Sequence, residues 1–312
     1  MYRVGIDLGG TNIAAGLVDR AGAILAKDSV PTLRARPWGE ILSDMAALAR
    51  RLAASAPGPV AGVGVGLPGS VNPPLGVVNY ANNLPVRDTP LARQLSDAAG
   101  LPVVIENDAN CAALGEYVAG AAKGSRNSIT VTLGTGIGGG IITEGRVYGG
   151  TFFAAGEIGH HVIAVGGERC SCGRLGCFEA YCSATGLIRV TRRAIEANPK
   201  GLMSEMVGGD LSLVNAKLPF DASRAGDKTA ALVIERYEDY LAEGLTNLIH
   251  IFDPDVIVIG GGIGKQGENL LVPVRERVSR LVYGELLNTR IVPAALGNDA
   301  GIVGAGMLET RN

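Results

Sequence analysis

The sequence predicts an α/β protein made of two similar halves with a cleft between them. Three observations carry this prediction. Strand-like and helix-like segments alternate along the 312 residues, which is typical of layered α/β folds. A strand, a hairpin rich in Gly and Thr, and a second strand occur at residues 4–18 and again at 129–143. The length also favours two domains, at roughly 150 residues for each.

Each element of the first half follows from a local pattern. Short apolar runs that stop at Gly or Pro predict strands, and apolar residues at every third or fourth position predict helices. The strands expected in this half are 4–8, 13–18, 24–33, 60–67 and 103–106. The helices expected are 40–54, 91–99 and 109–119, and the last two are closed by Gly100 and Gly120.

The second half repeats these patterns and adds a long helix. Its expected strands are 128–133, 140–143, 256–259 and 291–294. Its expected helices are 183–197, 228–251, 268–282 and 300–308. Two segments are assigned neither helix nor strand: 149–179, which is irregular and rich in Gly and Cys, and 198–227, which is polar and contains several Gly.

The composition excludes several classes of protein. With 47% apolar residues the chain is not intrinsically disordered, and its 46 Gly, about twice the usual share, indicate tight turns where backbone approaches a ligand. The net charge of −2, without a basic stripe, makes a nucleic-acid partner unexpected. No apolar stretch approaches the ~18 residues of a membrane span, and Asp7 interrupts the place where a secretion signal needs an apolar run.

The cysteines predict a metal site. There are five, and Cys170, Cys172 and Cys177 form a C-x-C-x₄-C cluster with two Gly that allow a tight turn. An odd, clustered set without a signal peptide is typical of a reduced, cytosolic protein and not of a disulfide framework. His160 lies ten residues before the cluster, so three thiolates and one imidazole would make a tetrahedral zinc site.

The fourth ligand of this site stays open at the level of the sequence. His161 or Cys182 could replace His160. In each case all four positions are filled by protein, so the zinc is expected to be structural and not catalytic. It would fix the loop that carries Glu157 and Glu179.

Three segments match G-x-G-x-x-G, at 64–69, 134–139 and 262–267. A dinucleotide loop of this form must open a helix after a strand. The first match runs into Pro residues and the second into a β-branched strand, so both fail. The third lies between an expected strand and an expected helix and stays a possible nucleotide contact. No P-loop signature occurs in the sequence.

Two Gly/Thr hairpins remain, at 7–12 and 133–140. Such hairpins expose backbone N–H groups and a hydroxyl, which suit phosphate oxygens. A pair of them could hold a polyphosphate from both sides, and Asp7 at the end of the first strand can orient a Mg²⁺ ion through water. The alternative is that both are turns and nothing more, which the duplicated context makes less attractive.

Asp108 is the candidate for proton transfer. It follows the run Val103 to Asn107, where a strand gives way to the start of a helix. A carboxylate at a helix N-terminus can be only a cap, since the helix dipole favours negative charge there. It can also be a general base that accepts a proton from a substrate hydroxyl while that hydroxyl attacks a phosphoryl group.

Together these residues resemble the ROK family of sugar kinases, which belongs to the hexokinase/actin-like superfamily. The resemblance covers essentially the whole chain, and the zinc knuckle with the preceding GEIGH is its most specific part. The matching segments are DLGGTN at 7–12, GLPGSV at 66–71, NNL at 82–84, ENDAN at 106–110, LGTGIGGG at 133–140, GEIGHH at 156–161, CSCGRLGCFEAYCS at 170–183 and VIVIGGGI at 256–263.

The resemblance implies a two-lobed, hexokinase/actin-like (ribonuclease H-like) ATPase fold with an interdomain cleft. It implies a small N-terminal lobe of residues 1–118 plus 298–312 and a large C-terminal lobe of residues 119–297. Members of the family are usually cytoplasmic and form homodimers or homotetramers. Sugar and ATP are therefore the expected partners, and ATP, Mg²⁺ and structural Zn²⁺ the expected cofactors.

The resemblance further implies phosphorylation of the 6-hydroxyl of a hexose, with Asp108 as the catalytic base. Glucose is the first candidate, and N-acetylmannosamine, N-acetylglucosamine and fructose are the alternatives. The positions that match sugar contacts are Gly69, Asn83, Asn107, Asp108, Glu157, His160 and Glu179. The positions that match nucleotide contacts are Asp7, Gly9, Gly10, Thr11, Asn12, Thr135, Gly136, Gly261 and Gly262. The positions that match zinc ligands are His160, Cys170, Cys172 and Cys177.

This chain departs from the family pattern at two positions. Many members carry Lys where it has Asn12, and many glucokinases carry an aromatic residue where it has Val86. A rival of a different class is a sugar-sensing regulator without activity, and the presence of Asp108 argues against it. A ROK-type repressor would need a winged-helix domain before the hairpin at residue 7, a nicotinamide dehydrogenase would need helix-opening Gly there, and an actin-like ATPase would lack the zinc knuckle.

Overall fold

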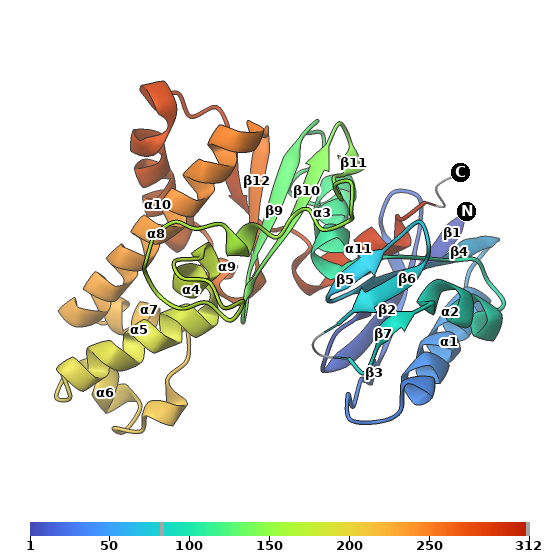
Figure 1. Ribbon diagram of the computed structural model, residues 1–312, viewed down its shortest axis with the longest axis horizontal. Coiled ribbons are helices and arrows are strands. Elements are labelled where there is room, and N and C mark those ends of the chain that lie inside the picture. The colour runs from blue at the N-terminus through green and yellow to red at the C-terminus, as the bar shows by residue number, and fades with distance from the viewer. Residues whose placement is uncertain (82–83, 310–312) are drawn as a thin grey trace. The chain divides into compact units, whose positions relative to one another are not determined.

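The computed structural model of the protein describes residues 1–81 and 84–309 (Figure 1). The chain forms two compact units. Unit 1 consists of Met1–Thr130, Gly139–Gly156 and Ala294–Asn312, and unit 2 of Val131–Gly138 and Glu157–Pro293. These bounds differ from the lobes expected from the sequence mainly at 119–130 and 139–156, which pack with unit 1.

A five-stranded sheet in the order β3-β2-β1-β4-β8 is the centre of unit 1. Strands β1, β4 and β8 run parallel, and β2 and β3 are antiparallel to their neighbours. All five strands were expected from the sequence. Their bounds are β1 (Tyr2–Leu8), β2 (Asn12–Val18), β3 (Ile24–Pro31), β4 (Val60–Leu67) and β8 (Val103–Asn107).

The third strand was predicted two residues too long. Pro31 pairs with Asn12, the first residue of β2, and one more backbone hydrogen bond, from the Thr32 N–H to the Thr11 carbonyl (2.9 Å), follows the end of the strand. Leu33 then turns the chain with a φ of 47°.

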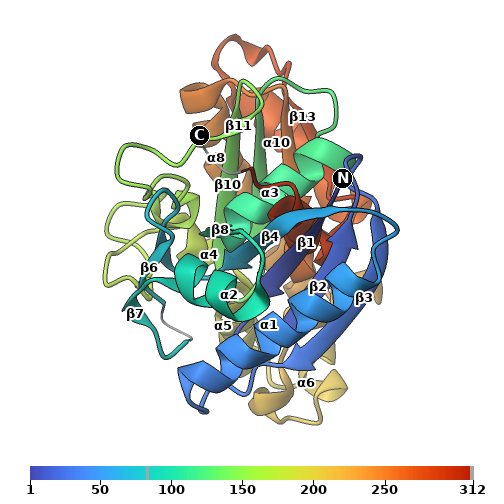
Figure 2. The same cartoon turned by 90° about the vertical axis from the view of Figure 1, so that its right-hand side faces the viewer.

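The two faces of this sheet are covered by different kinds of helix. Val4, Ile6 and Leu8 alternate along β1 and enter a core that includes apolar side chains of α1 (Trp38–Ala54) and α2 (Leu91–Ala99). Figure 2 shows α1 lying across this sheet. On the other face, α11 (Ala300–Gly306) packs on β1 and β4 and against α3 (Asp108–Ala119).

The contact of α11 with the sheet is made by backbone. A Cβ added at Gly5 would clash with the carbonyl oxygen of Ile302, and one added at Gly64 would clash with that of Ala305. Glycine at these two positions therefore lets the helix lie directly on the strands. The closing helix ends at Gly306, two residues before its expected end.

The second sheet has the order β11-β10-β9-β12-β13. Each sheet begins with three consecutive strands in reverse chain order, β3-β2-β1 or β11-β10-β9, and continues with two strands from later in the chain. The repeat expected from the sequence therefore extends to the order of all five strands. The strand β10 begins at Ile137, three residues before its expected start. The bounds are β9 (Ser128–Leu133), β10 (Ile137–Thr143), β11 (Arg146–Val147), β12 (Val256–Gly260) and β13 (Arg290–Pro293).

Three expected helices of unit 2 are confirmed, and one expectation is corrected. The confirmed helices are α5 (Ala184–Ala197), α8 (Lys228–Phe252) and α10 (Glu268–Leu281). The segment 198–227 was assigned no helix, but it contains α6 (Leu202–Met206) and α7 (Leu218–Arg224). These short helices close over a small core that includes Met203 and Leu218.

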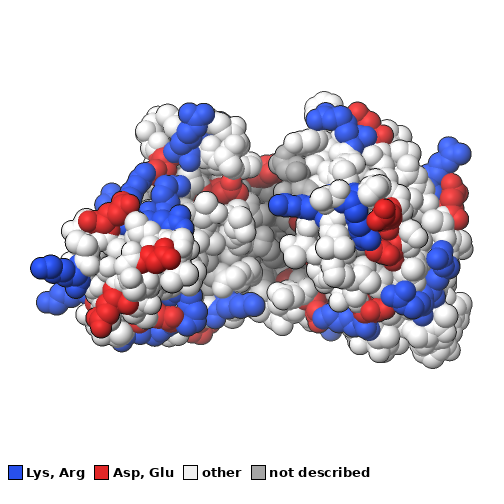
Figure 3. Space-filling model, turned by 90° about the horizontal axis from the view of Figure 1, so that it is seen from below, with Lys and Arg blue, Asp and Glu red and all other residues white. Residues whose placement is uncertain are grey.

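The remaining elements are short. They are the three-stranded sheet of β5 (Ser70–Asn72), β6 (Val77–Tyr80) and β7 (Arg87–Thr89), the helices α4 (Phe178–Cys182) and α9 (Gly261–Gly264), and the 3₁₀ turns Ile158–His160, Leu211–Leu213, Tyr283–Glu285 and Gly297–Asp299. Among the described residues no helix has the length and apolar character needed to span a membrane. Acidic and basic side chains are interspersed on the face seen in Figure 3.

Candidate active site

The carboxyl ends of the parallel strands of unit 1 gather the first group of candidate residues. Asp7 on β1 is in register with Gly66 on β4, and Gly66 is in register with Glu106 on β8. The loop after β4 begins with Pro68 and Gly69, and β8 leads directly into α3. In open α/β sheets ligands bind at this edge.

Asn107 holds the start of α3. It is the N-cap residue, and its Oδ1 accepts hydrogen bonds from the backbone N–H groups of Ala109 (2.9 Å) and Asn110 (3.2 Å). Its Nδ2 donates to the carbonyl oxygen of Gly69 at 3.2 Å. Gly69 has a φ of 102° and leaves no room for a Cβ against the Tyr80 carbonyl, so only glycine fits there. Two expected sugar-contact positions thus lie side by side.

Asp108 is the first residue of α3, and its Oδ1 accepts a hydrogen bond from the Ala109 N–H at 2.9 Å. Burial raises the pKa of Asp108 above its usual range, against hydrogen bonds from Ala109 and Asn107 that lower it. Burial, and then the charge of Asp108, raise the pKa of Asp7 to about 6. Two carboxyl groups therefore lie near enough at this edge to interact electrostatically, an arrangement suited to proton transfer and to a bound cation.

A buried carboxylate comes directly before Asn107, and the structure gives it a supporting role. Glu106 accepts hydrogen bonds from the Asn107 N–H (2.9 Å) and from Nδ2 of Asn110 (3.0 Å). It is 6% exposed. Its place directly before Asn107 in the ENDAN segment was the available signal, since it fixes the strand-to-helix turn that carries Asn107 and Asp108.

The first Gly/Thr hairpin joins β1 to β2 at the same edge. It is closed by a hydrogen bond from the Gly9 N–H to the Asn12 carbonyl (3.0 Å), and the Thr32 hydroxyl donates to the Gly9 carbonyl (2.6 Å). The N–H groups of Gly10 and Thr11 donate to no other residue that the structure describes. They are available to an anion such as a phosphate.

The second hairpin, residues 133–137, has the same design. The Gly134 N–H donates to the Gly136 carbonyl at 3.0 Å, and within the described chain the N–H groups of Thr135 and Gly136 have no acceptor. The backbone of Gly261, the first residue of α9 after β12, approaches Leu133 so closely that an added Cβ would clash with it. Gly261 and the exposed Gly262 therefore lie beside this hairpin, as expected for a nucleotide-binding loop.

Four side chains of unit 2 form a cluster that fits a zinc ion. The ligand atoms of His160, Cys170, Cys172 and Cys177 all lie within 4.8 Å of one another. The distance from Sγ of Cys172 to Sγ of Cys177 is 3.7 Å, and that from Sγ of Cys170 to Nδ1 of His160 is 3.6 Å. Tetrahedral Zn²⁺, with Zn–S of about 2.3 Å and Zn–N of about 2.0–2.1 Å, separates such atoms by about 3.8 and 3.5 Å.

The cluster bears on the alternatives for the fourth ligand. It includes His160 and neither His161 nor Cys182. The ring of His161 instead packs against Phe178, and Cys182 is fully buried. The other ring nitrogen of His160, Nε2, lies 3.9 Å from the exposed carboxylate of Glu157 and is left for a further contact.

Glu179 lies between the second hairpin and the cysteine cluster, and both belong to unit 2. Its Oε2 accepts a hydrogen bond from the N–H of Ile137 at 2.9 Å, and its Oε1 accepts one from the hydroxyl of Ser171 at 3.0 Å. Ser171 lies inside the cysteine cluster and was not singled out in the sequence. The signal in the sequence was its position, because it places a hydroxyl between the expected ligands Cys170 and Cys172.

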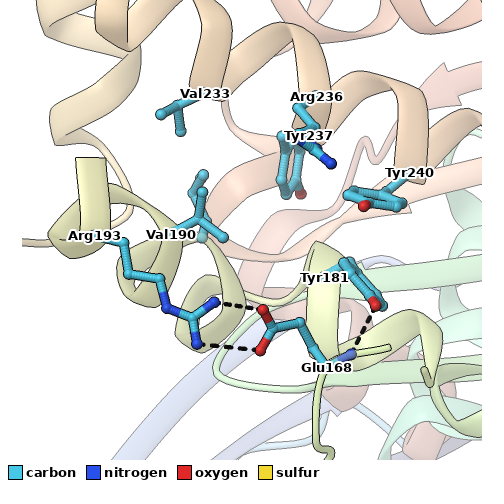
Figure 4. A pocket seen from close by; sticks show the side chains of 9 residues that line it. Glu168, Tyr181, Val190, Arg193, Val233, Arg236, Tyr237 and Tyr240 are labelled. Carbon is cyan, nitrogen blue, oxygen red and sulfur yellow. Dashed lines mark hydrogen bonds and ion pairs between the residues drawn. The ribbon is translucent and has the colours of Figure 1, made fainter. Parts of the chain in front are cut away.

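Unit 2 also contains a separate cavity of about 290 Å³, which no expected site residue lines. Tyr181, Tyr237 and Tyr240 form much of its wall, and Glu168 and Arg193 pair beside it (Figure 4). Of the remaining expectations, Asn83 lies outside the described residues. Val86 is 6% exposed and belongs to the core of unit 1.

Comparison with known proteins places the chain in a family. The model of the ROK family matches residues 3–312, and the protein belongs to this family. The chain is 37% identical to a glucokinase of Thermotoga maritima, over 98% of this chain and 96% of the relative.

Solved structures of the same family share the fold. The ROK family glucokinase of Streptomyces griseus, crystallised with glucose and AMPPNP, has a TM-score of 0.82 and 35% identity, and each chain is covered to 98%. The ROK hexokinase of Thermus thermophilus has a TM-score of 0.85 and 36% identity, with 98% of this chain and 97% of that chain covered. The hexokinase-like α/β fold expected from the sequence is confirmed.

Proposed function

We propose that the protein is an ATP-dependent hexose kinase that phosphorylates the 6-hydroxyl of glucose. The observation that carries the proposal is Asp108, a partly buried carboxylate at the start of a helix, close enough to Asp7 at the carboxyl ends of the strands for its charge to raise the pKa of that residue. The glucokinase relatives over nearly the whole chain favour glucose. N-acetylmannosamine, N-acetylglucosamine and fructose are the alternatives.

Asp108 acts as the general base. It accepts the proton of the 6-hydroxyl while the hydroxyl oxygen attacks the γ-phosphoryl group and the bond to the β-phosphate breaks, so that ADP leaves. Because burial raises the pKa of this carboxyl, its affinity for a proton is closer to what the transfer requires.

The other residues bind and orient. Gly69, Asn107, Glu157, His160 and Glu179 contact sugar hydroxyls, and so does Asn83. The free N–H groups of the two hairpins hold phosphate oxygens, with Gly261 and Gly262 beside the adenosine. Asp7 binds the water shell of Mg²⁺, which neutralises phosphate charge when bound. Asn12 leaves the first hairpin without a cationic side chain, so these N–H groups carry the contact.

His160, Cys170, Cys172 and Cys177 hold a structural Zn²⁺. The donor distances fit tetrahedral coordination, and four protein ligands leave no position for substrate. His160 would bind zinc through Nδ1 and a sugar hydroxyl through Nε2.

A sugar panel tests the proposed activity. The purified protein with MgATP should release ADP with glucose at a higher kcat/KM than with the three alternative sugars. The Asp108→Asn variant should release almost no ADP with any of them. A better N-acetyl sugar or fructose would reassign the substrate. If no sugar raises ADP release above the rate without sugar, the protein is a sugar-sensing regulator instead.

The remaining parts of the proposal concern assembly and location. The protein works as a homodimer or homotetramer in the cytoplasm. The five free cysteines are typical of a reducing compartment. Light scattering on the purified protein measures its mass in solution, and a monomer would contradict the proposed assembly.

A further inference from the structure

Glu179 connects the metal cluster to the second hairpin. We propose that it is a positioning residue through which the metal site sets the direction of the phosphate-binding N–H groups of Thr135 and Gly136. The inference rests on the proposed function for the role of this hairpin, and on the zinc fit for the role of the cluster. It adds to Glu179 a task distinct from contact with sugar.

The carboxylate of Glu179 is shared between two segments. One oxygen accepts from the Ile137 N–H at 2.9 Å, and the other accepts from the Ser171 hydroxyl at 3.0 Å and lies 3.7 Å from Sγ of Cys170. Residue 171 stands between two proposed zinc ligands. Each carboxylate oxygen has a second lone pair, so a sugar hydroxyl can still be bound.

The hairpin lies directly on this carboxylate. A Cβ added at Gly136 would clash with Oε2 of Glu179. This close approach explains why glycine is needed at the position next to Ile137. A small shift of Glu179 therefore has to move the hairpin with it.

Two further hydrogen bonds fix the hairpin to the chain just beyond Glu179. The Ala184 N–H donates to the Gly134 carbonyl at 2.8 Å, and the Thr185 hydroxyl donates to the Thr135 carbonyl at 2.8 Å. With the bond to Ile137, three contacts from residues 179–185 hold the hairpin. They leave the N–H groups of Thr135 and Gly136 free and orient them.

The cluster and Glu179 are mechanically linked. Cys177 is the N-cap residue of α4, and Glu179 is the second residue of that helix. The chain before it forms a loop held by isolated bridges and by backbone hydrogen bonds, such as that from the Cys170 N–H to the Arg174 carbonyl (2.9 Å). The metal would join the two cysteines on either side of Ser171 to Cys177 at the start of α4. Its loss should therefore loosen Ser171 and the start of α4 together, so that the hairpin loses one of its three contacts.

Amide hydrogen exchange of the peptide spanning 133–138 tests the coupling without reference to activity. Chelation of zinc from the wild-type protein should speed exchange at the Ile137 amide by about five- to tenfold, the loss of one hydrogen bond. Glu179→Ala should show the faster exchange already, and chelation should add little to it. The first hairpin, residues 8–12, is the internal control and should not change.

Ser171→Ala supplies a second test that keeps all four ligands and Glu179 in place. It should retain one zinc per chain, speed exchange at Ile137, and raise KM for MgATP several-fold. Ser279→Ala, which removes an exposed hydroxyl bonded to the Glu276 carbonyl in α10, is the matched control.

Two results would overturn the proposal. One is equal acceleration by chelation in wild type and Glu179→Ala, which would place the coupling elsewhere. The other is unchanged exchange at 133–138 in zinc-free wild type or in Ser171→Ala. A protein that shows the exchange pattern but phosphorylates no sugar would contradict the proposed function and leave the coupling intact.

Discussion

Asp7 shows how a functional residue can reduce the stability of the fold that holds it. Its carboxyl group is ionised at neutral pH although burial and the nearby charge of Asp108 oppose this, as its pKa of about 6 indicates. Because the pKa of Asp7 is higher in the folded state than the ordinary 3.8, its contribution to the free energy of unfolding is fully present below pH 3.8. That contribution is lost as the pH rises through 6. At pH 7.5 the charge therefore works against folding.

Asp7→Asn is expected to stabilise the protein without ligands. The gain should be about 3 kcal/mol at pH 7.5 and small at pH 4, because the folded-state carboxyl group, like the amide, is then uncharged. Urea unfolding at the two pH values measures it, and Asp97→Asn on the exposed face of α2 is the control. If the Asp7→Asn protein is no more stable than wild type at pH 7.5, the charge of Asp7 does not oppose folding.

The raised pKa of Asp108 makes a pH-dependent rate the expected behaviour. As general base it must be ionised, so kcat/KM should fall as the pH is lowered, with a midpoint above the usual range for Asp. Asp108→Asn should lower kcat by about 10²–10⁴-fold and abolish this acidic limb, while sugar affinity stays within several-fold. A pH–rate profile with isothermal titration of glucose measures both. Retained turnover would rule out the base assignment.

At the scale of the elements, α3 is fixed at both ends by carboxylates. At its start Glu106 holds the turn before Asp108. Near its end Glu116, with no exposed surface, accepts hydrogen bonds from the N–H groups of Ala121 (2.8 Å), Ala295 (3.1 Å) and Leu296 (2.8 Å). The second carboxylate thus ties α3 to the chain that enters α11.

Glu116→Gln should destabilise the protein by about 2–4 kcal/mol, because an amide places N–H groups opposite backbone N–H donors in a buried site. Chemical denaturation measures the loss. Glu144→Gln is the control, since Glu144 is exposed and its pair with Arg126 is worth at most about 1 kcal/mol. Equal losses in the two variants would show that burial of Glu116 has no special weight.

The cysteine cluster gives a prediction for the irregular segment around it. Cys172→Ser should lower bound zinc below one ion per chain and make the segment 160–177 more sensitive to protease, because zinc would cross-link a segment that has little regular secondary structure. Cys182→Ala should retain its zinc. Metal analysis after dialysis compares them. One tightly bound ion and full activity in Cys172→Ser would contradict the zinc proposal.

At the scale of the molecule, the sequence predicted the layers of the fold better than its small parts. Long runs such as 60–67 and 228–251 carry a clear period and end at turn residues. The strands β5, β6 and β7 have three or four residues each, too few to show alternation. The helices α6 and α7 are equally short, and tertiary packing stabilises them more than their own sequence does.

The candidate site was predictable where its residues are close in sequence. The ENDAN turn and the C-x-C-x₄-C cluster are local patterns with a chemical reason for their spacing. Glu116 and Glu179 behave differently, because their partners lie far along the chain: Leu296 is 180 residues from Glu116, and Ile137 is 42 residues from Glu179. A Glu in a helical pattern, such as Glu116, is normally read as exposed. Glu179 was expected to contact sugar, and only the fold shows its bond to Ile137.

Because α11 packs directly on the backbone of β1 and β4, it affects how the protein folds during synthesis. A ribosome releases β1 and β4 long before residues 300–306, the segment that covers Gly5 and Gly64. Until then one face of the nascent sheet stays exposed to solvent and accessible to chaperones. Unit 1 must therefore wait for nearly the entire translation product before it can fold, and a shortened message that stops before α11 should yield insoluble polypeptide.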